Sequence, residues 1–253
     1  RLATRGLGAF VHQFWHIPFP PPDLLNLLPY AVHESVVRGM LGNDLLEFHT
    51  ERHLVNFLDC VAEFVPDAEV RREHRRVRWR GREIHAGVFP ISIDVARYDA
   101  LAASPEGERR ARALRRAHAR DGCQLGVCVD RIDYTKGIPE RLRALDEMFE
   151  RSPELCGRVT FVLVATPSRS ELASYKALED EVLDTVAAIN ARWGTDDWTP
   201  IVLWHRNVPA EELAALYRVG DLCIVSSLQD GMNLVAKEFV ACNVDERGVL
   251  VLS

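Results

Sequence analysis

The residues best suited to chemistry lie between positions 226 and 238. The apolar run 222–225 is typical of a buried strand, small residues and Gly231 follow, and a helix is expected over 234–241. Free backbone N–H groups at such a helix start can bind an anion. Asp230 and Glu238 could hold hydroxyl groups of a sugar and a ribose. The alternative is an aspartate turn and an exposed glutamate, which the apolar neighbours of Glu238 disfavour.

A second polar loop carries two cations, Arg131 and Lys136, between a predicted strand and a predicted helix. An arginine can grip a phosphate through two parallel hydrogen bonds, and a lysine adds a point charge. Together they could neutralise a leaving diphosphate. The loop is not a P-loop, because the pattern GxxxxGK[ST] is absent. Surface ion pairs with Asp130 and Asp133 would explain the same residues, and the spacing alone leaves both interpretations open.

A third loop follows another predicted strand and contains Arg169. Ser168 or Ser170 could cap the helix expected over 170–192, which places Arg169 at a helix N-terminus. The helix dipole repels cations there and attracts anions. An anionic ligand beside Arg169 therefore explains the residue, and a solvated arginine is the alternative.

His16 follows an apolar stretch, 9–15, that is typical of a buried strand, and four prolines after it stop regular structure. Ligands of open α/β sheets contact such strand exits. A helix expected over 45–64 would place His49 and His53 on one face. The metalloprotease pattern HExxH is absent, so the sequence favours an ordinary polar face over a metal site.

The elements that must position these loops alternate regularly in the second half of the chain. Strands alternating with helices predict an α/β fold with a parallel sheet, whose loops should share one edge. The expected strands are 124–129, 159–165, 201–204, 222–225 and 249–252, and the expected helices are 139–150, 170–192, 210–217 and 234–241. Further helices are expected near 24–28 and 35–40, from about Val95, and over 106–120.

Seven arginines between positions 71 and 82 raise the possibility of nucleic-acid binding. Apolar residues alternate with polar ones on both sides of Arg80-Gly81-Arg82, which favours a hairpin with one solvated face. The formal net charge of the chain is −6, and no aromatic residues are interleaved with the arginines. The hairpin interpretation is therefore preferred, and no nucleic-acid partner is expected.

The composition limits the number of domains, the partners and the cellular compartment. The chain has 253 residues, 47% of them hydrophobic and 27% charged, which is typical of one or two globular domains. No apolar run is long enough for a transmembrane helix, so no membrane partner is expected. None of the six cysteines forms a CxxC pair, and most lie in apolar runs. Free thiols in a reducing, cytoplasmic compartment are expected.

Four motifs together resemble the trehalose-6-phosphate synthase family. They are His16-Ile17-Pro18-Phe19-Pro20, Asp130-Arg131-Ile132-Asp133-Tyr134-Thr135-Lys136-Gly137, Trp198-Thr199-Pro200 and Asp230-Gly231-Met232-Asn233-Leu234-Val235-Ala236-Lys237-Glu238. The resemblance implies a retaining GT-B glycosyltransferase with two Rossmann-like domains. It implies transfer of glucose from a nucleotide donor, usually UDP-glucose, to glucose 6-phosphate, with no cofactor and no metal. The leaving phosphate itself is thought to accept the proton, so no protein base is required.

The resemblance also implies roles for single residues. By position, His16 resembles the histidine that touches the transferred glucose, and Arg169 resembles a contact to the acceptor phosphate. Val208 lies where the family places a contact to the nucleotide base. The residues that resemble the donor site, some of them also catalytic, are Arg131, Lys136, Asp230, Gly231, Met232, Asn233, Leu234, Val235 and Glu238.

The chain departs from the family pattern at both ends. It opens at Arg1 without the family's glycine-rich loop and acceptor-binding aromatic residues, and it stops at Ser253 before the C-terminal helix. We therefore expect residues 1–88 to be the end of an acceptor-side domain and 89–253 to be most of a donor-binding domain. Alone, the chain is expected to catalyse poorly. A relative with another phosphorylated acceptor, such as a glucosylglycerol-phosphate synthase, a non-catalytic regulator and a homo-oligomer all stay open.

Overall fold

The computed structural model describes residues 9–120, 122–169 and 171–253, which divide into two compact units. The first unit ends at Ile91 and the second begins at Ser92. Each unit has its own sheet and its own hydrophobic core, and each is described separately below.

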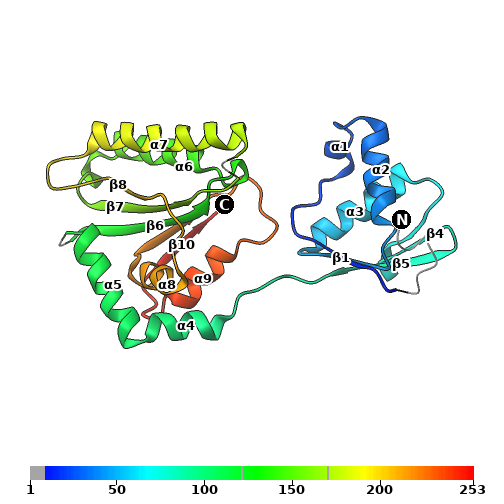
Figure 1. The fold of residues 1–253 in the computed structure, drawn as a ribbon, viewed down its shortest axis with the longest axis horizontal. Coiled ribbons are helices and arrows are strands. Elements are labelled where there is room, and N and C mark those ends of the chain that lie inside the picture. Colours follow the sequence, from blue (N-terminus) through cyan, green and yellow to red (C-terminus); the bar gives the residue numbers. More distant parts are fainter. Residues whose placement is uncertain (1–8, 121, 170) are drawn as a thin grey trace. The chain divides into compact units, whose positions relative to one another are not determined.

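The first unit is a five-stranded mixed sheet with its helices on one side (Figure 1). The strand order is β1-β2-β5-β4-β3, in which β1, β2 and β5 are parallel and the β3–β4–β5 meander is antiparallel. The elements are β1 (His12–Trp15), α1 (Pro22–Leu25), α2 (Tyr30–Met40), β2 (Leu45–Phe48), α3 (Glu51–Phe64), β3 (Glu69–Arg71), the 3-10 helix η2 (Arg72–His74), β4 (Arg76–Trp79) and β5 (Arg82–Val88).

The helix expected over 45–64 is wrong in its first six residues, because α3 begins only at Glu51. Residues Leu45–Phe48 form β2, which lies between β1 and β5, and only Glu51–Phe64 is helical. Leu46 and Phe48 are fully buried whereas their neighbours are not, which is the two-residue period of a strand. The hydroxyl of Thr50 accepts a hydrogen bond from the His53 amide and caps α3. The predicted hairpin is confirmed, because β4 and β5 pair antiparallel across Arg80 and Gly81.

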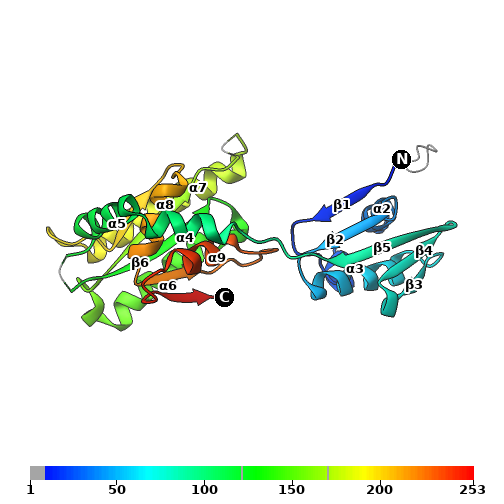
Figure 2. The same ribbon diagram turned by 90° about the horizontal axis from the view of Figure 1, so that it is seen from below.

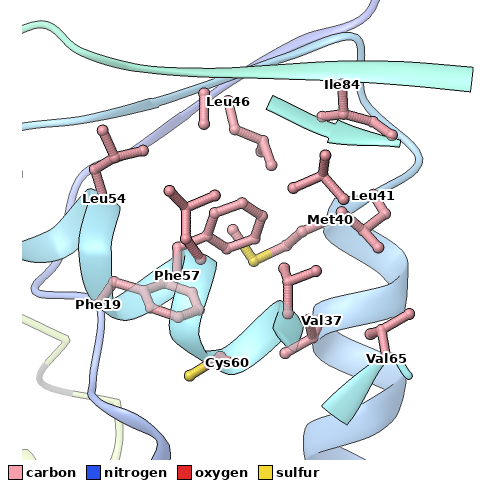
Figure 3. Packing of buried hydrophobic residues seen from close by; sticks show 14 of the residues in the cluster. Phe19, Val37, Met40, Leu41, Leu46, Leu54, Phe57, Cys60, Val65 and Ile84 are labelled. Carbon is pink, nitrogen blue, oxygen red and sulfur yellow. The ribbon is translucent and has the colours of Figure 1, made fainter. Parts of the chain in front are cut away.

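The core of the first unit lies between α3 and the sheet (Figure 3). Phe57 is fully buried, with its ring centroid 5.6 Å from that of Phe19 and 5.3 Å from that of Phe48. Asn56 donates a hydrogen bond of 2.7 Å to the carbonyl of Phe19. Helix α3 therefore anchors the proline-rich segment that follows His16.

The second unit is a three-layer α/β fold around a parallel five-stranded sheet. Its elements are α4 (Val95–Ala103), α5 (Pro105–His118), β6 (Gln124–Arg131), the 3-10 helix η3 (Tyr134–Lys136), α6 (Ile138–Arg151), the 3-10 helix η4 (Pro153–Leu155), β7 (Val159–Thr166), α7 (Ala173–Trp193), β8 (Ile201–Trp204), α8 (Ala210–Val219), β9 (Leu222–Val225), α9 (Leu234–Cys242) and β10 (Val249–Leu252). The strand order is β10-β9-β6-β7-β8. If these strands are numbered 1 to 5 along the chain, the order read from β8 is 3-2-1-4-5, which is that of a Rossmann-like sheet.

Two apolar layers sandwich this sheet, with α6 and α7 on one face and α8 and α9 on the other (Figures 1 and 2). The side chains of β6 alternate between them, so that Leu125 and Val127 join one core whereas Cys128 joins the other. Burial on both faces explains why β6 and β7 read as nearly continuous apolar runs in the sequence.

Candidate functional site

The strand order places a switch point between β6 and β9. These strands are adjacent in the sheet, but the chain leaves them toward opposite ends of the strand order. Ligands of open α/β folds bind beyond the carboxyl ends of the strands at such a point. Arg131 is the last residue of β6, Lys136 lies in the loop after this strand, and Asp230 lies in the loop after β9, so the sheet brings the two most informative sequence segments to one edge.

Lys136 and Asp230 form the direct link between these loops. The ammonium of Lys136 lies 2.6 Å from Oδ2 of Asp230, and both side chains are mostly buried. The same carboxylate oxygen accepts a hydrogen bond of 3.0 Å from Asn233 and one of 3.4 Å from Ser227. The alternative pairing of Lys136 with Asp130 or Asp133 is therefore wrong, because the loop turns Lys136 toward the β9 loop.

Asp133 shapes the β6 loop. Its Oδ1 accepts hydrogen bonds from the amide and the hydroxyl of Thr135, at 3.0 and 2.8 Å, and so caps η3. Burial opposes its charged form, but these hydrogen bonds outweigh burial and lower the pKa of Asp133. Arg131, at the end of β6, is exposed and forms no salt bridge with any carboxylate in the described part of the chain.

Gly137 joins η3 to α6 and is required for two reasons. Its φ is +62°, a left-handed conformation, and an added Cβ would lie 2.8 Å from the carbonyl oxygen of Ser226 in the β9 loop. The glycine thus allows the two loops to approach each other, and the amide of Gln229 donates to the carbonyl of Thr135 at 3.2 Å beside it.

We expect Gly137→Ala to lower the free energy of unfolding of the second unit by about 2 kcal/mol and to weaken ligand binding at the switch point. Urea unfolding followed by tryptophan fluorescence measures the loss. The matched control is Gly122→Ala, since Gly122 has φ +80° but open space around its Cβ position. Only the conformational cost, about 1 kcal/mol, is expected there. Equal losses in both variants would contradict the loop-approach argument.

The start of α9 lies where the sequence predicts an anion site. Asn233 is its N-cap, with Oδ1 accepting a hydrogen bond of 2.9 Å from the amide of Ala236. Gly231 is buried, whereas Met232, Leu234 and Val235 are half-buried. The backbone of this turn, which follows β9, can present its N–H groups to a negatively charged group.

Glu238 is held in place by two phenols, which makes an exposed glutamate the wrong interpretation. The hydroxyl of Tyr98, on α4, donates to Oε1 at 2.9 Å, and the hydroxyl of Tyr217, on α8, donates to Oε2 at 3.0 Å. Burial and the Glu238 carboxylate raise the pKa of Tyr98 to about 12 and the pKa of Tyr217 well above its usual value. Both phenols therefore remain donors at neutral pH. Sequence reasoning did not find them, because Tyr98 lies 140 positions away.

Arg169 takes part in a hydrogen-bonded chain that reaches the β6 loop. It has φ +50°, its Nη1 donates to the Tyr175 hydroxyl at 3.0 Å, and that hydroxyl donates to Asp133 Oδ2 at 3.3 Å. The predicted serine cap of α7 is not supported. The helix begins at Ala173 after Leu172, which makes no side-chain cap, and Ser170 lies outside the described residues. Arg169 thus precedes the helix and is held by Tyr175.

The remaining predicted residues lie elsewhere in the two units. Val208 is half-buried before α8 and packs against the core on that face of the sheet. His16 is exposed at the carboxyl end of β1, with its ring centroid 5.7 Å from that of His49. His49 follows β2 and is not on a helix with His53, because α3 begins later. Within the described ranges, no cluster of three or more histidine, cysteine or acidic side chains could hold a metal ion.

Comparison with known proteins gives the family. A profile described as glycosyltransferase family 20 matches residues 4–253, so the chain belongs to that family. It is 38% identical to the yeast Saccharomyces cerevisiae protein "Alpha,alpha-trehalose-phosphate synthase [UDP-forming] 56 kDa subunit", over 96% of this chain and 48% of the relative. It is 40% identical to a bifunctional trehalose-6-phosphate synthase/phosphatase of Thermoproteus tenax, over 99% of this chain and 33% of that protein.

Solved structures agree with the fold. A UDP-forming trehalose-phosphate synthase from Burkholderia xenovorans in complex with glucose-6-phosphate matches 99% of this chain, with TM-score 0.91 and 32% identity. An E. coli structure, described as trehalose-6-phosphate bound with UDP-2-fluoro glucose, matches 99% with TM-score 0.90 and 31% identity. The GT-B fold class is thereby confirmed. The chain spans 54% of each of these chains and about half of the yeast relative.

Proposed function

We propose that this protein transfers glucose with retention from UDP-glucose to glucose 6-phosphate, which gives trehalose 6-phosphate. The observation that carries the proposal is the switch point between β6 and β9, where Arg131, Lys136 and the start of α9 meet at one edge of a parallel sheet. Membership of glycosyltransferase family 20, and the UDP-2-fluoro glucose named for the similar E. coli structure, support a nucleotide-sugar donor at this edge.

The chemistry follows from the charges at this edge. Departure of a nucleoside diphosphate builds negative charge on its phosphates. Arg131 can bind those oxygens through two parallel hydrogen bonds, Lys136 contributes a point charge, and the N-terminus of α9 contributes backbone N–H groups. Lys136 and Asp230 would orient the donor, and Glu238, which two phenols hold on α9, would accept hydrogen bonds from the ribose hydroxyls.

The roles of the remaining residues, one of them on the acceptor side, are proposed on fewer contacts. Arg169 would bind the acceptor phosphate, His16 would touch the transferred glucose, and Val208 would contact the base. We also propose that no metal is needed, because the two cations and the helix start supply the positive charge that a metal would otherwise provide.

A transfer assay tests the proposal. Because the relatives are about twice as long, the assay uses the protein from the complete open reading frame around this chain, with UDP-glucose labelled in the sugar. We expect labelled trehalose 6-phosphate from glucose 6-phosphate, at an unchanged rate in EDTA. If product forms only with glycerol 3-phosphate, that compound replaces glucose 6-phosphate as the proposed acceptor. Binding of UDP without any transfer would instead indicate a regulatory family member, and a rate lost in EDTA would contradict the metal-free mechanism.

Three further proposals concern partners and location. The arginines of the β3–β5 meander are proposed not to bind nucleic acid, because several are paired with carboxylates: Arg71 with Glu69, Arg72 with Asp59, Arg75 with Glu51, Arg76 with Glu83 and Arg82 with Asp44.

A cytoplasmic location is proposed because all six cysteines are free thiols and five are buried. No helix in the described residues is long and apolar enough to cross a membrane. A homo-oligomer is a further proposal, which light scattering can test.

A further inference from the structure

A buried arginine that no motif singled out lies behind the donor site. Arg141, on α6, is 3% exposed, and its Nη2 donates a hydrogen bond of 2.7 Å to Oδ2 of Asp130, whose side chain is equally buried. Asp130 is on β6, directly before Arg131. The ion pair therefore connects α6 with the end of the strand that carries the first site cation.

The other hydrogen bonds of Arg141 go to the two loops of the switch point. Its Nε donates to the hydroxyl of Ser226 at 2.8 Å, and its Nη2 also lies 3.4 Å from the carbonyl oxygen of Lys136. Ser226 is the first residue after β9, and Lys136 is the last residue of η3. One guanidinium thus joins the strand end, the Lys136 loop and the Asp230 loop.

Stability alone does not require this arrangement. A buried ion pair must offset a large desolvation cost, and well-packed apolar side chains of similar volume often give an equally stable protein. Nη1 of Arg141 is also buried with no hydrogen-bond partner among the described residues. The chain tolerates a buried charge with one unsatisfied donor, and the hydrogen bonds that this charge makes lead to the two site loops.

We propose that Arg141 is a positioning residue that holds Lys136 and Asp230 at a fixed separation across the switch point, ready for a nucleoside diphosphate. The inference rests on the proposed function for the ligand, and on the hydrogen bonds above for the geometry. A site fixed before its ligand arrives loses less conformational entropy on binding. The Arg141 side chain is 3% exposed, so it would act through the two loops and not by touching the nucleotide.

The test removes the polar connection and keeps the packing. In the double variant Asp130→Leu/Arg141→Met, the second unit should stay folded with a melting temperature close to that of the unaltered protein. Its UDP affinity, measured by calorimetry on the 253-residue chain, should fall about tenfold. Amide hydrogen exchange without nucleotide should accelerate in residues 132–137 and 226–233, while β7 stays protected. Ser226→Ala, which removes one bond of the set, should accelerate exchange in 226–233 and lower UDP affinity about threefold.

The matched control is Arg143→Met on the same helix. Arg143 is exposed and pairs only with Glu140 and Glu181 among the described residues, so neither exchange nor affinity should change. A folded double variant with unchanged loop exchange and affinity would overturn the inference. If the double variant does not fold, unchanged loop exchange and UDP affinity in Ser226→Ala would overturn it equally. If the unaltered chain binds no UDP, the proposed function fails, and hydrogen exchange alone still decides the positioning role.

Discussion

Arg131→Ala is expected to lower UDP affinity by about 10- to 100-fold without changing the stability of the second unit. A charge-assisted hydrogen bond contributes about 1.5–3 kcal/mol, and a guanidinium can make two to a diphosphate. Arg131 is exposed and has no salt bridge within the described residues, so its removal leaves no buried carboxylate without a partner. Calorimetry with UDP measures the affinity, and thermal unfolding measures the stability.

The matched control is Arg116→Ala. Arg116 is also an arginine without a salt bridge in the described chain, but it lies on α5 rather than at a strand exit. If UDP binding depended only on a general attraction to basic surface, both substitutions would weaken it equally. Loss in Arg131→Ala alone identifies a local diphosphate contact. Unchanged UDP affinity in Arg131→Ala would contradict the donor-site assignment.

Much of the second unit can be predicted from its sequence because its central strands β6 and β7 are buried on both faces. A strand such as 159–166 reads as a continuous apolar run with turn residues around it, and the alternation with helices gives the parallel sheet. The boundary between strand and helix in the first unit is harder to predict from the sequence. Its strand β2 is four residues long and is followed closely by an amphipathic helix, so the two merged into one predicted helix. A single buried pair of alternating residues is too short a pattern to separate them.

The residues of the site also divide into those that the sequence predicts and those that it does not. The residues that follow strands were found, because a parallel sheet places all such loops at one edge. Their partners were not, since Lys136 meets Asp230 across 94 positions and Glu238 meets Tyr98 across 140. Arg141 occupies a position that reads as an ordinary helix residue, and only the packing of α6 against β6 shows that its charge is buried. Long-range polar pairs leave no periodic signal in the sequence.

The second large effect is expected in the first unit, where Phe57→Ala should lower the free energy of unfolding by about 3–5 kcal/mol. Phe57 is fully buried between Phe19 and Phe48, so the truncation removes apolar contacts and leaves a cavity that two aromatic neighbours can fill only in part. Domains of this size have about 5–15 kcal/mol in total. The melting temperature of this unit should fall by more than about 12 °C.

The same variant tests how His16 is positioned. Phe19 lies three residues after His16 and is held by the Phe57 ring and by the Asn56 amide, so the cavity should loosen the segment that carries the histidine. Calorimetric scans should show the loss in the transition of the first unit, while UDP affinity, for which we propose a site in the second unit, stays unchanged. Val55→Ala, on the same helix but 41% exposed, should lower stability by less than about 1 kcal/mol. Similar losses in the two variants would show that the aromatic cluster around Phe57 does not dominate this core.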